Sequence, residues 1–135
     1  MELRTHGLEL HLRPAGHADA EGWMRVEVEA RVSGFIANYS AELQVEDLER
    51  FARELREMQD GLGRESTATL TSAQPDLLIE LKMNRLGQIS GRYAFESARR
   101  GGVPTVLSCA FDMDQSFLTS LQHGLATLVS AVQSL

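Results

Sequence analysis

The sequence predicts one α+β domain over residues 1–135, with a mainly antiparallel meander sheet of about six or seven strands and two helices packed on one face. Three observations predict it. Apolar and polar residues alternate with period two in several short segments, which is typical of strands with one buried face. The period changes to 3.6 in two segments, as in amphipathic helices. Short connections suit antiparallel neighbours rather than crossovers, and the predicted order is β-β-β-α-β-β-β-β-α.

The N-terminal third of the chain contains two clear alternating segments and a third that continues them. Residues 8–13 predict a first strand, because leucines alternate there with charged or histidine side chains. Residues 14–22 form a loop, and residues 23–32 predict a long second strand. The pair Ser33-Gly34 interrupts the pattern, and residues 35–43 predict a third strand or a bent continuation of the second.

Near Val45 the apolar period changes from two to 3.6, which predicts the first helix. Its apolar stripe consists of Leu48, Phe51, Ala52, Leu55, Met58 and Leu62. Acidic residues Glu46 and Asp47 suit its first turn, where the helix dipole favours negative charge. Gly61 and Gly63 suit its end.

Four further alternating segments follow this helix. They cover residues 66–72, 77–83, 88–96 and 105–112. Turn chemistry separates them at Gln74-Pro75-Asp76, at Arg85-Leu86-Gly87 and at residues 99–102. Cys109 has the apolar parity of the last segment, which predicts a buried and unreactive thiol.

The second predicted helix begins near Asp114, a good N-cap residue, and runs to the end of the sequence. Its apolar stripe consists of Leu118, Leu121, Leu125, Leu128, Val132 and Leu135. No Asp, Glu, Lys or Arg occurs between Gln115 and Leu135, which indicates little solvent exposure. Either the first helix or a second copy of the protein would then cover the side of this helix that faces away from the sheet. We favour coverage by the first helix of the same chain. Gly124 costs about 1 kcal/mol in a helix, so we expect another backbone to approach there.

Charge is unevenly distributed along the chain. The formal net charge is −6, with thirteen acidic and seven basic residues in residues 1–63 and six of each in residues 64–135. An acidic protein is a poor candidate for direct nucleic-acid binding, because phosphate contacts need Lys and Arg. It is a better candidate for binding a basic protein. A net charge of −6 is equally ordinary for a soluble globular protein.

The sequence gives no sign of export or membrane insertion. Residues 1–12 carry charges throughout, unlike a signal peptide, and no run of about 18 apolar residues occurs. A single cysteine offers no internal disulfide. We therefore expect a cytoplasmic protein with no membrane contact.

The sequence contains no catalytic or metal-binding pattern, so we expect no enzyme activity, no cofactor and no metal. The four histidines, His6, His11, His17 and His123, have no metal-ligand spacing. Asp112 lies at a predicted strand end and Asp114 at a predicted helix cap, which accounts for both without a catalytic role. The alternation of its strand places Trp23 on the polar face, together with charged residues. It is either an anchor for a protein interface or a side chain that folds over the sheet edge to close the core.

Several local patterns together resemble the immunity proteins of the WapI family. They are Trp23 at the start of an alternating strand, Gly34-Phe35, Glu46-Asp47-Leu48-x-x-Phe51, Leu77-x-Ile79-x-Leu81, Gly87-x-Ile89 and Phe111-x-x-Asp114-Gln115-Ser116-x-Leu118. The resemblance covers about residues 23–128. It implies a bacterial protein that protects the cell from the C-terminal toxin domain of a contact-delivered toxin. The shared residues belong to the fold, so it assigns no functional residue.

The resulting hypothesis is a small cytoplasmic binding protein that neutralises a basic toxin domain, such as a nuclease, by protein–protein contact. The expected contact residues lie on the polar sheet face (Trp23, Arg25, Glu27, Glu29, Arg92) or on the acidic helix face (Glu46, Glu49, Glu57). Two alternatives stay open. One is a small-ligand-binding domain with a pocket between sheet and helices. The other is a homo-oligomeric structural module that uses the uncharged last helix as its dimer contact.

Overall fold

The computed structural model describes residues 1–5, 7–72, 76–97 and 103–133. Within them the chain forms eight strands and two helices. Their bounds are β1 (Glu2–Arg4), β2 (Leu8–Pro14), β3 (Trp23–Val32), β4 (Phe35–Gln44), α1 (Val45–Asp60), β5 (Ser66–Thr71), β6 (Leu77–Met83), β7 (Ile89–Ser97), β8 (Thr105–Met113) and α2 (Phe117–Gln133). The α+β class and the two helices are confirmed. The order is four strands and a helix, repeated once.

The strands form two separate antiparallel sheets rather than one. Sheet 1 has the order β1-β2-β3-β4 and sheet 2 the order β5-β6-β7-β8. The expected single sheet of six or seven strands is therefore wrong in two respects. Strand β1 was not expected, and α1 separates two meanders that do not pair with each other in the described residues. Residues 35–43 belong to a strand of their own, because Gly34 (φ +80°) allows a tight turn that pairs Val32 with Phe35.

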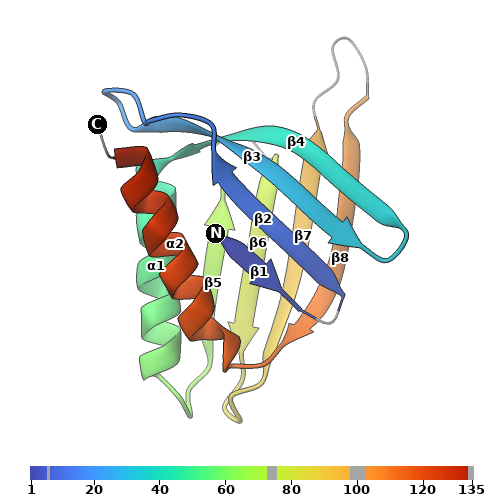
Figure 1. Cartoon of the computed structure of the whole chain (residues 1–135). Coiled ribbons are helices and arrows are strands. Elements are labelled where there is room, and N and C mark those ends of the chain that lie inside the picture. The colour runs from blue at the N-terminus through green and yellow to red at the C-terminus, as the bar shows by residue number, and fades with distance from the viewer. Residues whose placement is uncertain (6, 73–75, 98–102, 134–135) are drawn as a thin grey trace.

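The two sheets and two helices enclose one hydrophobic core. In Figure 1 the strands of sheet 1 cross those of sheet 2, and the helices lie side by side along one edge. Helix α1 packs on β5, and α2 packs on α1, β1 and β2. Buried side chains of both sheets and both helices form a single cluster, with Leu10, Val26, Phe51, Leu70 and Leu125 fully buried. Each sheet is thus covered on one face only, as its alternation predicts. Leu62, expected in the apolar stripe of the first helix, comes after the end of α1 and is 58% exposed.

Local chemistry explains where each helix begins. The backbone N–H of Gln44 donates to the Asp47 carboxylate (3.0 Å), which fixes the first turn of α1. The Asp114 carboxylate accepts from the N–H of Ser116 (2.8 Å), and this hydrogen bond holds the pKa of Asp114 below its ordinary value. Asp114 therefore stabilises the turn that leads into α2, close to its expected role.

Helix α2 confirms one expectation and corrects another. A β-carbon on Gly124 would lie 3.4 Å from the Cα of Met1, so the expected close approach of another backbone exists, and β1 supplies it. The stripe is buried from Leu118 to Val132, and Leu135 lies outside the described residues. The opposite side of the helix, including Ser120 and Thr127, is exposed. The absence of charge does not reflect full burial, because α1 and sheet 1 cover only one side of α2.

Two further expectations concern turns and the single cysteine. The turn at residues 85–87 is confirmed, with Gly87 at φ +81° and the Asn84 side chain accepting from the N–H groups of Leu86 and Gln88. The expected turns at 74–76 and 99–102, the latter with Arg99 and Arg100, lie wholly or largely outside the described residues. Cys109 is exposed rather than buried. It has the inward parity of β8, but no residue of that strand from Thr105 to Ala110 is buried.

Candidate functional site

Trp23 lies at the start of β3, where a tight turn holds it. One carboxylate oxygen of Asp19 accepts hydrogen bonds from the backbone N–H groups of Glu21 (2.9 Å) and Trp23 (2.9 Å). The N–H of Asp19 in turn donates to the Trp23 carbonyl (2.8 Å). This side-chain-to-backbone pattern is a local alternative to strand pairing, and it fixes the position of the tryptophan backbone before β3 begins.

The first turn of helix α1 lies beside Trp23. Trp23 pairs in register with Gln44, and the N–H of Val45 donates to the carbonyl of Gly22 (2.9 Å). The start of the polar sheet face and the start of the acidic helix are therefore neighbours in space. Sequence reasoning treated these as two alternative surfaces, and the structure joins them at one end of sheet 1.

A hollow of about 590 Å³ opens at this end of the sheet. Its lining residues are Ala15, Gly16, His17, Asp19, Trp23, Met24, Arg25 and Glu42. Trp23 is half-buried, whereas Arg25 and Glu42 are exposed and form a loose ion pair (3.8 Å). The hollow thus combines a partly accessible aromatic ring with two carboxylates, one guanidinium group and one imidazole. We call these eight residues the Trp23 hollow.

The acidic side chains of α1 extend this surface away from the hollow. Glu46, Glu49 and Glu57 are all exposed, as expected. Glu49 accepts a hydrogen bond from Gln133 of α2 (3.2 Å). Asp47 pairs with Arg50 (3.1 Å), and in the described part of the chain no basic side chain pairs with Glu46 or Glu57. These two carboxylates are available to a cationic partner.

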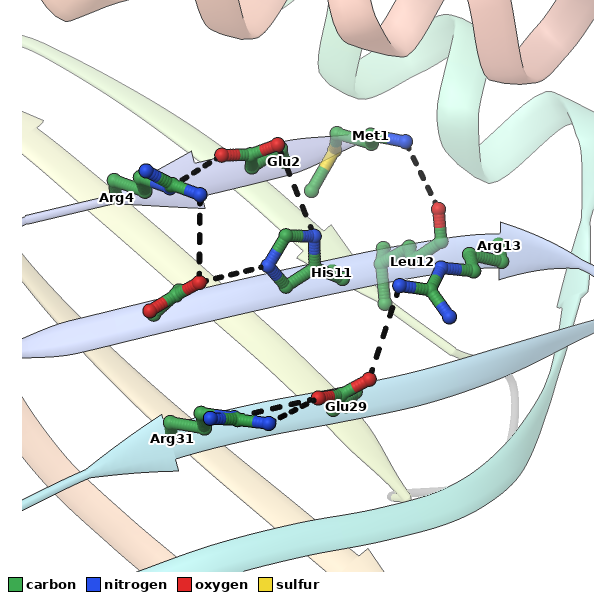
Figure 2. A network of polar contacts seen from close by, with 9 residues as sticks. Met1, Glu2, Arg4, His11, Leu12, Arg13, Glu29 and Arg31 are labelled. Atoms are coloured by element: carbon green, nitrogen blue, oxygen red, sulfur yellow. Dashed lines mark hydrogen bonds and ion pairs between the residues drawn. The ribbon is translucent and has the colours of Figure 1, made fainter.

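The rest of the outer face of sheet 1 carries a network of charged side chains that neutralise one another (Figure 2). Arg4 lies between Glu2 and Glu9, and Glu29 lies between Arg13 (3.9 Å) and Arg31 (3.3 Å). Exposed ion pairs of this kind contribute little to stability. Because of these pairs, this part of the outer face of sheet 1 has fewer unpaired charges than the region around Trp23.

His11 lies inside the same network. Its two ring nitrogens are 3.8 Å from Glu2 and 3.1 Å from Glu9, and the side chain is half-buried. The hydrogen bond from His11 is the main reason why the pKa of the Glu9 carboxyl lies below its ordinary value. Nearby, burial lowers the pKa of the amino group of Met1, which donates to the Leu12 carbonyl (2.9 Å).

The expected sheet-face residues do not all lie together. Trp23, Arg25, Glu27 and Glu29 share the outer face of β3, where Glu27 accepts from the hydroxyl of Ser40 (3.0 Å). Arg92 lies on β7 in sheet 2, where it pairs with Glu80 (2.9 Å). The single polar face expected from the sequence is in fact two faces, and Arg92 is not beside Trp23.

Sequence reasoning missed Asp19, His17 and Glu42 as members of the hollow. Glu42 comes to it only through the register, because it pairs with Arg25 across β3 and β4. Asp19 had a detectable signal, since an Asp four residues before a strand start, with Gly22 between, is typical of a side-chain-capped turn. His17 lies in the loop before β3, and its sequence context carries no such signal.

A second and larger hollow, of about 1120 Å³, lies at the end of sheet 2 near the β6–β7 turn. Polar residues in its lining include Ser66, Lys82, Ser90, Asp112 and Asp114. The hydroxyl of Ser66 is buried and has no hydrogen-bond partner among the described residues. Both hollows open to the surface, so neither is the pocket between sheet and helices that a small-ligand domain was expected to have.

The described residues lack two further kinds of feature. They contain no group of three or more His, Cys, Asp or Glu side chains placed to hold a metal ion. No helix among them has the length and apolar content needed to cross a membrane.

Comparisons with known proteins give one family and one structure. The model of the family described as "Immunity protein WapI-like family" matches residues 2–132. No curated protein matches this chain. The crystal structure of WHY1 from Arabidopsis thaliana is similar over 98% of this chain and 88% of that one, with 9% identity and a TM-score of 0.45. Such a score supports no functional argument.

Proposed function

We propose, because the chain belongs to the immunity protein WapI-like family, that it protects a bacterial cell by binding a toxin domain and blocking it through protein–protein contact. The family match supports an immunity role and a toxin as the protein partner. Inhibition by contact needs no catalytic group and no cofactor. We place the encounter in the cytoplasm, where an intracellular toxin would act.

The observation that carries the proposed contact site is the half-buried Trp23 in an open hollow edged by Asp19 and Glu42. Tryptophan is enriched among the residues that dominate binding energy at protein interfaces, where the bound partner packs around the ring and excludes water from it. The surrounding carboxylates and the nearby Glu46 supply charge that steers a cationic partner. We therefore centre the interface on the Trp23 hollow and extend it toward the first turn of α1.

The charge distribution supports a basic partner such as a nuclease. The whole net charge of −6 arises in residues 1–63, which form sheet 1 and α1. A nuclease attracts phosphates with a positively charged active site, so an acidic inhibitor gains both association rate and specificity. Direct binding of nucleic acid by this chain is disfavoured for the same reason.

Recovery of the partner with matched variants tests this proposal. We would capture partners from lysates of the source bacterium with the tagged wild-type protein, with Trp23→Ala/Glu42→Lys, and with Arg92→Ala as the control on the other sheet. A toxin domain should be recovered by the wild type and by the control but lost with the double variant. The recovered domain would then be expressed alone for binding and growth-protection measurements.

With the purified toxin domain, Trp23→Ala should raise Kd by about 30-fold or more, since removing such an anchor costs about 2 kcal/mol or more. Charge reversal at Glu27 and Glu29 tests the remaining sheet face, and reversal at Glu46, Glu49 and Glu57 tests the helix face. The contact site proposed here is wrong if Trp23→Ala combined with reversal of Glu27 and Glu29 leaves toxin binding unchanged.

A further inference from the structure

Strand β8 is the outermost strand of sheet 2 and has a free edge. The other outer strands all contact elements outside their own sheet: α1 packs on β5, α2 contacts β1, and β4 contacts both α1 and β7. The hydroxyl of Tyr39 on β4 also donates to the carbonyl of Asp76. In the described part of the chain, β7 is the only element with which β8 makes extensive contact.

The edge of β8 from Thr105 to Phe111 also lacks the features that normally prevent strand addition, and Asp112 is the one charged residue of the strand. Natural edge strands are protected by charged side chains, prolines, bulges or a covering element. From Thr105 to Phe111 the strand has no charged residue and no proline, and Pro104 comes before it. Val106 is 54% exposed, and Ser108, Cys109 and Ala110 are exposed on alternating faces. Such an edge presents unpaired backbone donors and acceptors to another strand.

The distribution of charge along the chain indicates which partner strand best fits the edge of β8. Residues 64–135, which include sheet 2, carry six acidic and six basic side chains, whereas residues 1–63 carry the whole excess of −6. A basic partner is attracted to the acidic half, around the Trp23 hollow. Two copies of this acidic chain repel each other least when their neutral halves meet. We propose that β8 pairs with β8 of a second copy about a two-fold axis, joining the two copies of sheet 2 into one continuous sheet.

The strand is self-complementary in this arrangement. An interface with two-fold symmetry places residue i opposite j and j opposite i. Full pairing of the nine residues Thr105–Met113 centres the axis on Cys109. Ser108 then faces the partner's Ala110, Leu107 faces the partner's Phe111, and Asp112 faces the partner's Val106. No like charges oppose each other, which cross-strand pairing requires.

Cys109 meets its own copy at the axis, which gives a direct test of the register. Directly opposed residues of antiparallel strands have Cα atoms about 4.5–5.5 Å apart, within the range that a disulfide spans. Cys109 is the only cysteine in the chain, so any disulfide-linked dimer must join the two Cys109 residues. In the crosslinking test, two thiols are oxidised to one disulfide and the added diamide takes up both hydrogens.

The mass of the full chain in solution is the first measurement. Under reducing conditions, sedimentation equilibrium over a series of concentrations should show association from 14.9 kDa to twice that mass. Ser108→Lys/Ala110→Lys brings four positive charges together at the axis and should abolish the dimer. The matched control is Asn38→Lys/Ser40→Lys, which makes the same charge change on exposed positions of β4 and should leave the dimer intact. Circular dichroism checks that every variant is folded.

A further variant distinguishes a dimer contact on the β8 edge from one on the exposed side of α2, which also carries no charged side chain. Ser120→Lys/Thr127→Lys on α2 should leave the dimer intact, and loss of the dimer in that variant alone would overturn the assignment to β8. A wild type that stays monomeric at the highest concentration overturns the proposal. A dimer that the β8 lysines break but that diamide fails to crosslink overturns the register centred on Cys109. None of these results depends on the toxin, so they do not bear on the proposed immunity role.

Discussion

The two halves of this chain share an order of elements but differ in the surfaces they expose. Each half has four antiparallel strands and one helix. The outer face of sheet 1 carries linked ion pairs, among them those of Glu9 and Glu29 (Figure 2). The outer face of sheet 2 combines small or hydroxyl side chains with charged ones, and the ion pairs on it converge on Glu80.

This difference shows which part of each strand the fold constrains. Side chains of inward parity must be apolar in both halves, because both sheets bury that face in a common core. Side chains of outward parity only meet solvent, so they are free to serve binding. The charged half then suits a cationic partner, and the neutral half suits contact with an equally acidic copy.

The largest expected effect comes from the core that both halves share. Phe51 on α1 is fully buried in it, whereas Phe35 at the start of β4 is 64% exposed. Phe51→Ala should lower the free energy of unfolding by about 3–5 kcal/mol, since it removes the ring and leaves a cavity. Phe35→Ala should change it by about 0.5 kcal/mol or less. Urea unfolding measures both, and equal effects would mean that the Phe51 ring is not packed in this core.

A smaller effect distinguishes the second half, where an aromatic ring lies over a glycine. Gly91 on β7 pairs with Phe111 on β8, and a β-carbon at Gly91 would lie 2.3 Å from the Phe111 ring. Gly91→Ala should therefore destabilise the protein by about 1–3 kcal/mol through overpacking. Its backbone has no positive φ, so the effect is not one of strain.

The matched test of that explanation is a double-mutant cycle with Phe111→Leu. If the clash is the cause, Gly91→Ala should cost much less in the Phe111→Leu background than in the wild type. Additive effects would show that the glycine is needed for another reason. Ser90→Ala, on the exposed face of the same strand, should be close to neutral.

Much of the local structure could be predicted from the sequence, because period and turn chemistry act over a few residues. Strand β3 and helix α1 begin where the alternation and the change of period place them. Strand β1 escaped prediction since three residues with one apolar side chain, Leu3, show no period. The division into two sheets escaped it as well, because alternation reports that a strand has a buried face but not which sheet buries it.

The candidate site was predictable only in part, for a similar reason. Trp23 is conspicuous in the sequence, but Glu42 joins it through the register of β3 and β4, and Arg92 is separated from it by the division into two sheets. Cys109 was misassigned because parity gives the direction of a side chain, whereas burial depends on whether the opposite layer extends far enough to cover it.

The smallest expected effect compares one carboxyl group from each half under acid. Hydrogen bonds from His11 and from Arg92 are the largest causes of the lowered pKa values of Glu9 and Glu80, respectively. Because each of these carboxyl groups has a lower pKa in the folded state than in the unfolded state, its ionised form stabilises the protein at pH values above the unfolded-state pKa of about 4.5. This contribution is lost as the pH falls through the folded-state pKa. Both contributions should therefore disappear on the acid side of about pH 4.5.

Removing each partner should act only within its own sheet. His11→Ala should raise the pKa of Glu9 and leave that of Glu80 unchanged, and Arg92→Ala should do the reverse. Titration of the side-chain carboxyl groups by carbon-13 NMR measures both shifts in each variant. If His11→Ala also raised the pKa of Glu80, the charges of the two outer faces would be coupled through the core. The two faces would then not be free to change independently, and separate roles in toxin binding and self-association would lose their physical basis.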